Sequence, residues 1–138
     1  MKAKLLLAAL GLFYLGLISA AAQRGFTEFE TEDEIKVMYR WQRAVFFLKN
    51  SDAVLGLRVT NLSDSPVKWT YSVAFYNDKM LTYESETSEL CLLPGQSRRG
   101  SLAGLRYTVE GMKKDEVESD SFSWDFGTFR VEEVESCE

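Results

Sequence analysis

Histidine is absent from the 138 residues of the chain. Ser-His-Asp and Cys-His catalysis both depend on an imidazole as general base, and imidazole is also the commonest protein ligand of zinc and copper. The sequence therefore excludes these two classes of nucleophilic enzyme. It predicts no catalytic residue, no metal site and no cofactor.

Carboxylates remain as candidates for catalysis, because two acids held about 5 to 10 Å apart can hydrolyse a glycoside. Asp125 is the one acid in an aromatic setting, between Trp124 and Phe126. Its position in an alternating strand puts it on the face opposite the rings, and therefore in solvent. A small secreted carboxylate-dependent hydrolase is thus a less favoured alternative to a protein that is not an enzyme.

Two acidic clusters, residues 28–34 and 115–120, could attract calcium, a cation that prefers oxygen ligands. Neither cluster has the D-x-[DN]-x-[DN]-G spacing that orders ligands around the ion. A charge run without such spacing is typical of a solvated surface. We therefore expect both clusters to lie in solvent.

The two cysteines are Cys91 and Cys137. In an oxidising compartment a single disulfide is their expected state. It would close a loop of about 47 residues and stabilise the fold by roughly 4 kcal/mol, according to the chain-entropy relation. The alternative is a pair of free thiols, with Cys137 close to the end of the chain.

The first residues, MKAKLLLAALGLFYLGLISAAAQ, join a basic start to an apolar run and then to small residues. This layout is typical of a cleavable secretory signal over residues 1–22, with cleavage between Ala22 and Gln23. An uncleaved membrane anchor is the alternative, but the apolar run is short for a bilayer span. We expect a secreted or periplasmic protein with no membrane span after cleavage.

Cleavage would remove Lys2 and Lys4, which lowers the number of basic residues from 16 to 14 against 21 acidic residues. The resulting net charge of −7 would repel a polyanion, so no nucleic acid is expected as a partner. The remainder, about 116 residues, has the size of one domain. We assign residues 23–34 to a polar acidic lead-in and residues 35–138 to that domain.

Apolar and polar residues alternate along most of the domain, with turn-forming residues between the runs. Residues 67–76 place large apolar side chains on one face, which is typical of a half-buried strand. The other predicted strands include residues 35–48, with a bend near residues 42–43, and residues 53–62, 80–83, 100–109 and 122–134. The pattern favours an all-β, antiparallel immunoglobulin-like sandwich of about seven strands, with a closed barrel as the alternative.

Gly127 interrupts the alternation of the last strand. The residues expected to point inward are Phe122, Trp124 and Phe126 before it, and Phe129 and Val131 after it. Such a change of phase predicts a β-bulge at the glycine. We also expect a two-residue hairpin turn at residues 77–78 and a charged surface loop over residues 110–121.

The stretch VTNLSDSPVKWTYSVAFYND, followed later by LLPGQS, resembles bacterial secreted immunoglobulin-like domains of the FxLYD type. Phe75, Tyr76 and Asp78 stand where such domains end a long strand, although Asn77 interrupts the order and no leucine precedes the tyrosine. The resemblance covers residues 55–97. It implies a sandwich fold and a binding or structural module, and it brings no catalytic residues.

One apolar run, AVFFLK, departs from alternation. If it is exposed, Val45, Phe46 and Phe47 would form an edge or a contact surface for another protein; if not, they belong to a strand buried on both sides. The sequence thus predicts a non-catalytic exported module of the cell envelope that acts by protein-protein contact. An accessory chaperone for a secreted client is the alternative, and an uncovered strand edge near Phe46 would favour it.

Overall fold

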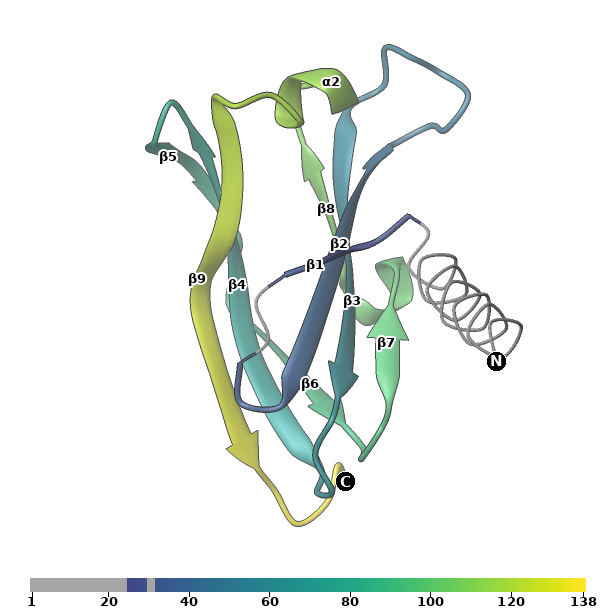
Figure 1. Ribbon diagram of the computed structural model, residues 1–138, viewed down its shortest axis with the longest axis vertical. Helices are drawn as coiled ribbons and strands as arrows, with labels where there is room; N and C mark the ends of the chain where they lie inside the picture. Colours follow the sequence, from purple (N-terminus) through teal and green to yellow (C-terminus); the bar gives the residue numbers. More distant parts are fainter. Residues whose placement is uncertain (1–24, 30–31) are drawn as a thin grey trace, which may run out of the picture.

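A computed structural model describes residues 25–29 and 32–138 of the chain. These residues form two antiparallel sheets, a 3-10 helix and one short α-helix (Figure 1). The elements are β1 (Thr27–Glu28), β2 (Ile35–Arg43), β3 (Ala53–Asn61), β4 (Val67–Asn77), β5 (Met80–Glu84), β6 (Ser88–Leu92), β7 (Ser97–Arg99), η1 (Ser101–Ala103), β8 (Arg106–Val109), α2 (Lys114–Val117) and β9 (Phe122–Glu133).

The first sheet, sheet A, has the order β1-β2-β3, and the outer edge of β3 is shared by β7 and β8. β7 pairs with residues 58–60 of β3, whereas β8 pairs with residues 53–56. These two short strands therefore act as one strand that is interrupted by η1. β1 lies in the predicted lead-in and pairs with the middle of β2.

The second sheet, sheet B, is built around β4. β9 pairs with β4 along its whole length on one edge. On the other edge β6 pairs with residues 67–71 and β5 with residues 74–77. β5 and β6 thus form the second interrupted strand of the fold, and β4 is the central strand of its sheet.

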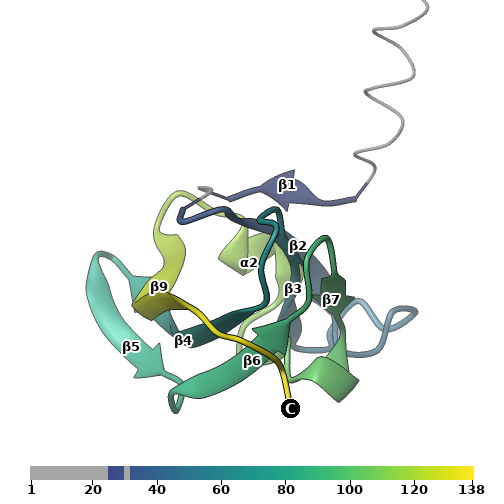
Figure 2. The ribbon, with the colours of Figure 1, turned by 90° about the horizontal axis from the view of Figure 1, so that it is seen from below.

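The chain crosses between the layers after β3, β6 and β8, which produces two facing sheets rather than a closed barrel (Figure 2). With β2, β3, β4 and β9 taken as strands A, B, C and F, the order matches an immunoglobulin-like sandwich. Trp69 on β4 is then the buried tryptophan of strand C. The predicted fold class is confirmed, but the described residues form nine strands rather than about seven, because β1 forms within the predicted lead-in and η1 separates β7 from β8.

The core lies between the sheets. The large apolar residues predicted to point inward over residues 67–76 do so, since Trp69, Tyr71 and Phe75 are among the largest fully buried side chains. The prediction of a half-buried strand is wrong, because Thr70, Ser72 and Ala74 on the opposite face are buried too. Ile35, Leu55 and Leu57 on sheet A face them. Burying such side chains stabilises the fold by about 1.5–3 kcal/mol each, before the entropy of ordering them is subtracted.

The predicted bulge is confirmed: Ser72 pairs with Thr128 and Val73 with Phe126, which leaves Gly127 as the extra residue. The hairpin after β4 differs by one position from the prediction. Asp78 and Lys79, not residues 77–78, have positive φ angles of 49° and 66°. Positive φ at both central residues is typical of a type I′ turn, whose twist matches that of the flanking strands.

Three predicted segments differ in the structure. β2 ends at Arg43, so residues 44–48 belong to a hairpin loop and not to the opening strand. Residues 100–105 contain η1 where a continuous strand was predicted. The charged loop after β8 contains α2, which is held to the core by the buried side chain of Val117.

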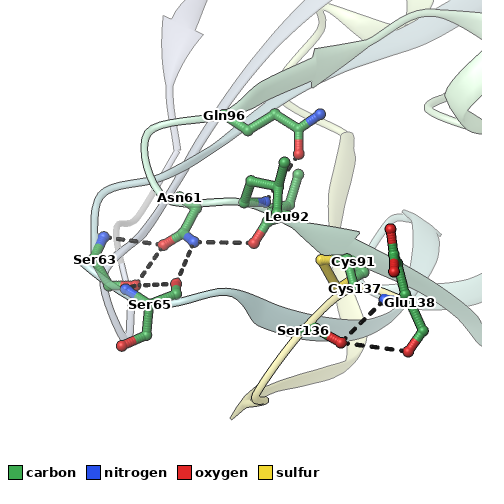
Figure 3. The surroundings of a disulfide bond; sticks show 10 residues. Asn61, Ser63, Ser65, Cys91, Leu92, Gln96, Ser136, Cys137 and Glu138 are labelled. Atoms are coloured by element: carbon green, nitrogen blue, oxygen red, sulfur yellow. Dashed lines mark hydrogen bonds between the residues drawn. A yellow bond between two sulfur atoms is a disulfide. The ribbon is translucent and has the colours of Figure 1, made fainter.

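The predicted disulfide between Cys91 and Cys137 is present and ties the segment after β9 to β6 (Figure 3). Near it, Asn61 is fully buried. Its amide nitrogen donates to the carbonyl oxygens of Ser65 and Leu92 at 2.8 and 3.1 Å, and its Oδ1 accepts from the N–H of Ser63 at 2.9 Å. A side chain used in this way fixes the turn between β3 and β4.

Candidate binding cleft between the sheet edges

A cleft among the described residues is lined by β2 of sheet A and by β9, the edge strand of sheet B. These two strands lie on the same side of the sandwich, where β1 crosses β2 (Figure 1). The volume of the cleft is about 1090 Å³, at the upper end of the range for ligand sites. The lining comes from β2, β9, α2, the start of β1 and the loop after β2. Its residues are Gly25, Thr27, Phe29, Tyr39, Arg40, Trp41, Gln42, Arg43, Phe46, Lys114, Val117, Glu118, Ser119, Phe122, Ser123 and Trp124.

Aromatic rings form the inner wall of the cleft. The inward positions of β2 supply Tyr39 and Trp41, and those of β9 supply Phe122 and Trp124. The ring centroids of Tyr39 and Trp124 are 5.3 Å apart, and those of Trp41 and Phe122 are 5.7 Å apart, both in edge-to-face geometry. Edge-to-face pairs of this kind hold the two sheet edges at a fixed separation.

Phe29, which follows β1, closes one end of the cleft. Its N–H donates to the carbonyl of Val37 at 2.8 Å, which extends the pairing of β1 with β2. Its ring centroid is 4.4 Å from that of Trp124 and 5.4 Å from that of Phe126. The end of the predicted polar lead-in therefore contributes to the wall of the cleft.

The main chain of β9 adds hydrogen-bonding capacity along the cleft. The N–H of Val134 donates to the carbonyl oxygen of Pro66, and the N–H of Asp78 donates to that of Ser121. These two bonds show which residues of β9 direct their main-chain groups toward β4. Because the main-chain groups of successive residues point to opposite edges, those of Trp124, Phe129 and Val131 point away from β4. No other strand of the described residues pairs with β9, and this is the position of strand G in an immunoglobulin sandwich.

The predicted partner surface, Val45, Phe46 and Phe47, lies at the tip of the loop between β2 and β3. Phe46 is 82% and Phe47 70% exposed, and Val45 is exposed to a smaller extent. The residues therefore do not form an edge strand or a doubly buried strand. The loop is ordered by Ser51, whose Oγ donates to Leu48 and accepts from the N–H of Val45. Of the three residues, Phe46 reaches the rim of the cleft.

The charges at the cleft are mixed. Arg40, Arg43 and Lys114 contribute cations, and Glu118 contributes the one carboxylate of the described lining. Lys114 Nζ is 2.6 Å from Glu118 Oε1 in an i,i+4 pair along α2. Paired-carboxylate hydrolysis requires a second acid about 5 to 10 Å away, which the described lining does not supply.

Other candidate catalytic residues lie elsewhere. Asp125 is exposed on the outer face of sheet B, where its carboxylate accepts the N–H of Phe126 at 2.7 Å. Ser65 and Lys68 match the S-x-x-K spacing, but this spacing brings both residues to one face only in a helix. Lys68 lies on β4 and its Nζ is 3.3 Å from Glu132 Oε2. Among residues 25–29 and 32–138, no group of three or more acids or cysteines could hold a metal ion.

The titrating groups with shifted pKa values are two tyrosines away from the cleft. Burial raises the pKa of Tyr107 on β8, and it also raises the pKa of Tyr71 on β4. The Tyr107 hydroxyl donates a hydrogen bond to that of Tyr71, which raises the first pKa and lowers the second. These tyrosines lie on different sheets, and neither lines the cleft.

Two of the site predictions cannot be placed on the cleft. The predicted cleavage point between Ala22 and Gln23 lies outside the described residues. The disulfide joins β6 to the segment after β9 (Figure 3), and neither cysteine lines the cleft. No helix within the described ranges is long and apolar enough to cross a membrane. The open edge of β9 and the contribution of α2 were not predicted from the sequence.

Comparison with known proteins gives few matches. No protein-family model matches the chain, and no curated protein matches it. Among solved structures, the chain is similar to the trimeric lipoprotein SadB of Salmonella enterica, with 14% sequence identity and a TM-score of 0.42. The match covers 96% of this chain and 78% of that protein.

Proposed function

We propose that the protein is a non-catalytic, exported module of the cell envelope that binds another protein. The cleft between β2 and β9 is the binding site, and Phe46, from the exposed tip at Val45, Phe46 and Phe47, lies on its rim. The observation that carries this proposal is the combination of a wall of aromatic rings with an unpaired strand edge. Aromatic side chains bind apolar groups, and an unpaired edge binds an extended main chain.

The mode of binding that fits both features is strand addition. An extended segment beside β9 would receive main-chain hydrogen bonds from Trp124, Phe129 and Val131. Its alternate side chains would point into the cleft, toward Trp41 and Phe122. Hydrogen bonds give affinity in this mode, while the pockets for alternate side chains give specificity. Such a segment would occupy the position of the missing strand G.

Export is supported by the disulfide, because disulfides persist in oxidising compartments such as the periplasm and the cell exterior. The basic and apolar start of the chain supports the same location. The resemblance to FxLYD-type domains stays a prediction. Secretion, with cleavage between Ala22 and Gln23, would leave the sandwich free of the membrane.

An accessory chaperone for a secreted client is the second candidate. The specific observation in its favour is that the open edge of β9 and the rim residue Phe46 belong to the same cleft. A chaperone would use this cleft to cover a strand edge or a loose strand of its client until assembly. The two candidates differ in the lifetime of the complex and not in the binding site.

Site-specific photo-cross-linking in the native host tests the proposal. A photoreactive residue is placed at Phe47, next to the rim residue Phe46, at Ser123 in the lining of the cleft, or at Leu102, an exposed apolar residue of η1 that does not line the cleft. We expect the same protein to be cross-linked from positions 47 and 123 and not from position 102. Labelling from all three positions, or from none, would contradict a partner that is bound in the cleft.

The substitution Phe46→Asp should abolish that cross-link without unfolding the protein, because Phe46 is mostly exposed. Leu102→Asp is the matched control, since it places the same charge on another exposed apolar residue. A stable partner indicates an envelope module, whereas a partner bound only during export indicates the chaperone.

A further inference from the structure

The outer face of sheet A carries four neighbouring arginines. In one row across the sheet Arg40 of β2 and Arg106 of β8 flank Gly56 of β3. In the next row Arg58 of β3 lies directly opposite Arg99 of β7. Like charges directly opposite each other destabilise a sheet, so this arrangement does not help the fold.

None of the four arginines forms an ion pair with an acid among residues 25–29 and 32–138. The cations of the Lys68–Glu132 and Lys114–Glu118 ion pairs lie elsewhere in the fold. The chain as a whole has more acidic than basic residues, 21 against 16. The cluster therefore does not reflect an overall excess of cations in the chain. An anion from outside the protein would neutralise its positive charge.

Three of these arginines, Arg40, Arg99 and Arg106, converge on a pocket of about 290 Å³. Gly56 and Gln42 form part of its lining, and the Gln42 amide packs directly over the glycine, because a Cβ atom at position 56 would come within 2.6 Å of the amide nitrogen. Gly100 and Ser101, in the interruption between β7 and β8, form another wall. The pocket thus depends on the break that separates the two short strands.

Arg40 shows that the pocket is prepared for an acceptor. Its guanidinium lies 4.5 Å from the centroid of the Phe26 ring, which fixes the plane of the group. Its Nε atom is buried and has no hydrogen-bond partner. A buried donor without a partner is costly, and native structures rarely retain one without a reason.

We propose that this pocket binds a phosphoryl group carried by a small organic molecule or by a lipid headgroup. Guanidinium groups have donors only and bind the oxygens of phosphate in bidentate geometry. Three of them match a dianion with three terminal oxygens better than a carboxylate, which has one charge and two oxygens. The volume leaves room for the group that carries the phosphate. This site is independent of the cleft between β2 and β9, although Arg40 and Gln42 border both.

Glycerol 3-phosphate is the soluble probe, and titration calorimetry is the measurement. We expect saturable binding with a Kd of about 1 mM or tighter. The substitutions Arg99→Gln and Arg106→Gln should each weaken it by about tenfold or more, because each removes charge-assisted hydrogen bonds. Arg106→Lys should weaken it as well, since a lysine cannot bind in bidentate geometry. Both arginines are exposed, so these variants should fold.

Arg130→Gln is the matched control, because Arg130 is an exposed arginine on β9 that is outside the pocket and the substitution changes the net charge equally. It should leave the affinity unchanged. Equal weakening by Arg130→Gln, or an affinity for malonate as high as that for glycerol 3-phosphate, would overturn the assignment of a phosphoryl site. Absence of saturable binding to every phosphate probe would overturn it too.

Cosedimentation with phosphatidylcholine vesicles, with and without phosphatidic acid, distinguishes the two sources of the phosphoryl group. Binding to phosphatidic acid that is lost in Arg99→Gln and kept in Arg130→Gln identifies a headgroup. Binding of glycerol 3-phosphate without vesicle binding identifies a soluble ester. Vesicle binding that is weakened equally by all the variants would reflect general charge attraction and would contradict the site.

Discussion

The hydroxyl of Ser72 on β4 accepts a hydrogen bond from the N–H of Thr128 on β9 at 2.8 Å, and it also donates to Glu84 Oε1 at 3.2 Å. Thr128 directly follows Gly127, the extra residue of the bulge. A side chain thus satisfies a main-chain donor at the point where the ladder between the two long strands is interrupted.

Ser72→Ala should therefore destabilise the protein by about 1–3 kcal/mol, because the N–H of Thr128 would lose its partner in a partly buried place. Urea unfolding followed by tryptophan fluorescence measures the change. Ser123→Ala, an exposed substitution on the same strand, is the control and should change the stability by less than about 0.5 kcal/mol. Equal stability of the two variants would show that the bulge does not depend on Ser72.

Removal of the disulfide should destabilise the sandwich by about 2–4 kcal/mol, because the unfolded chain gains freedom when Cys91 and Cys137 are no longer joined. The double variant C91S/C137S gives this value in thermal or urea unfolding. Adding reductant should lower the stability of the parent protein toward that of the variant and leave the variant itself unchanged. A parent protein that is insensitive to reductant at all urea concentrations would contradict the expected contribution.

The stability should fall in alkaline solution because burial raises the pKa of Tyr107 and of Tyr71 above the ordinary value of 10.0. In the unfolded chain these tyrosines ionise near pH 10, while in the folded protein they keep their protons. The unfolded state therefore binds fewer protons as the pH rises from about 10 toward the raised pKa of the folded state, and stability is lost over that range.

Tyr107→Phe should make this dependence on pH shallower, since it removes the group with the larger shift and leaves Tyr71. Urea unfolding at a series of pH values from about 8 to 11 measures the slope. Tyr76→Phe, at the end of β4, is the control and should retain the slope of the parent protein. If the free energy of unfolding falls as steeply with pH in Tyr107→Phe as in the parent protein, the Tyr107 hydroxyl is not the source of the alkaline loss of stability.

Local patterns in the sequence were sufficient to predict the sheets. The alternation along β4 and the change of phase at Gly127 reflect the period of two of a pleated strand, which is a property of neighbouring residues. The same approach gave the wrong structure for residues 44–48, because a run of apolar residues does not reveal whether its side chains are covered. α2 was missed because four residues, with Val117 as the one buried anchor, are too few to show a helical period.

The candidate sites depend on contacts between residues that are far apart in the sequence. Trp41 and Phe122 were both predicted to face inward, but their meeting across an open side follows from the order of the strands. Likewise, Arg40 of β2, Arg99 of β7 and Arg106 of β8 come together because all three strands pair with β3. Sequence spacing does not contain this information when strands are joined across two layers.

Amide hydrogen exchange along β9 tests most directly whether the sandwich is open at this edge. In the purified protein, after correction for intrinsic rates, the N–H groups of Trp124, Phe129 and Val131 should exchange about tenfold or more faster than those of Asp125, Arg130 and Glu132, which face β4. Uniformly slow exchange along the strand would show that its outer edge is already covered, and it would contradict the proposal that this edge receives a segment of another protein.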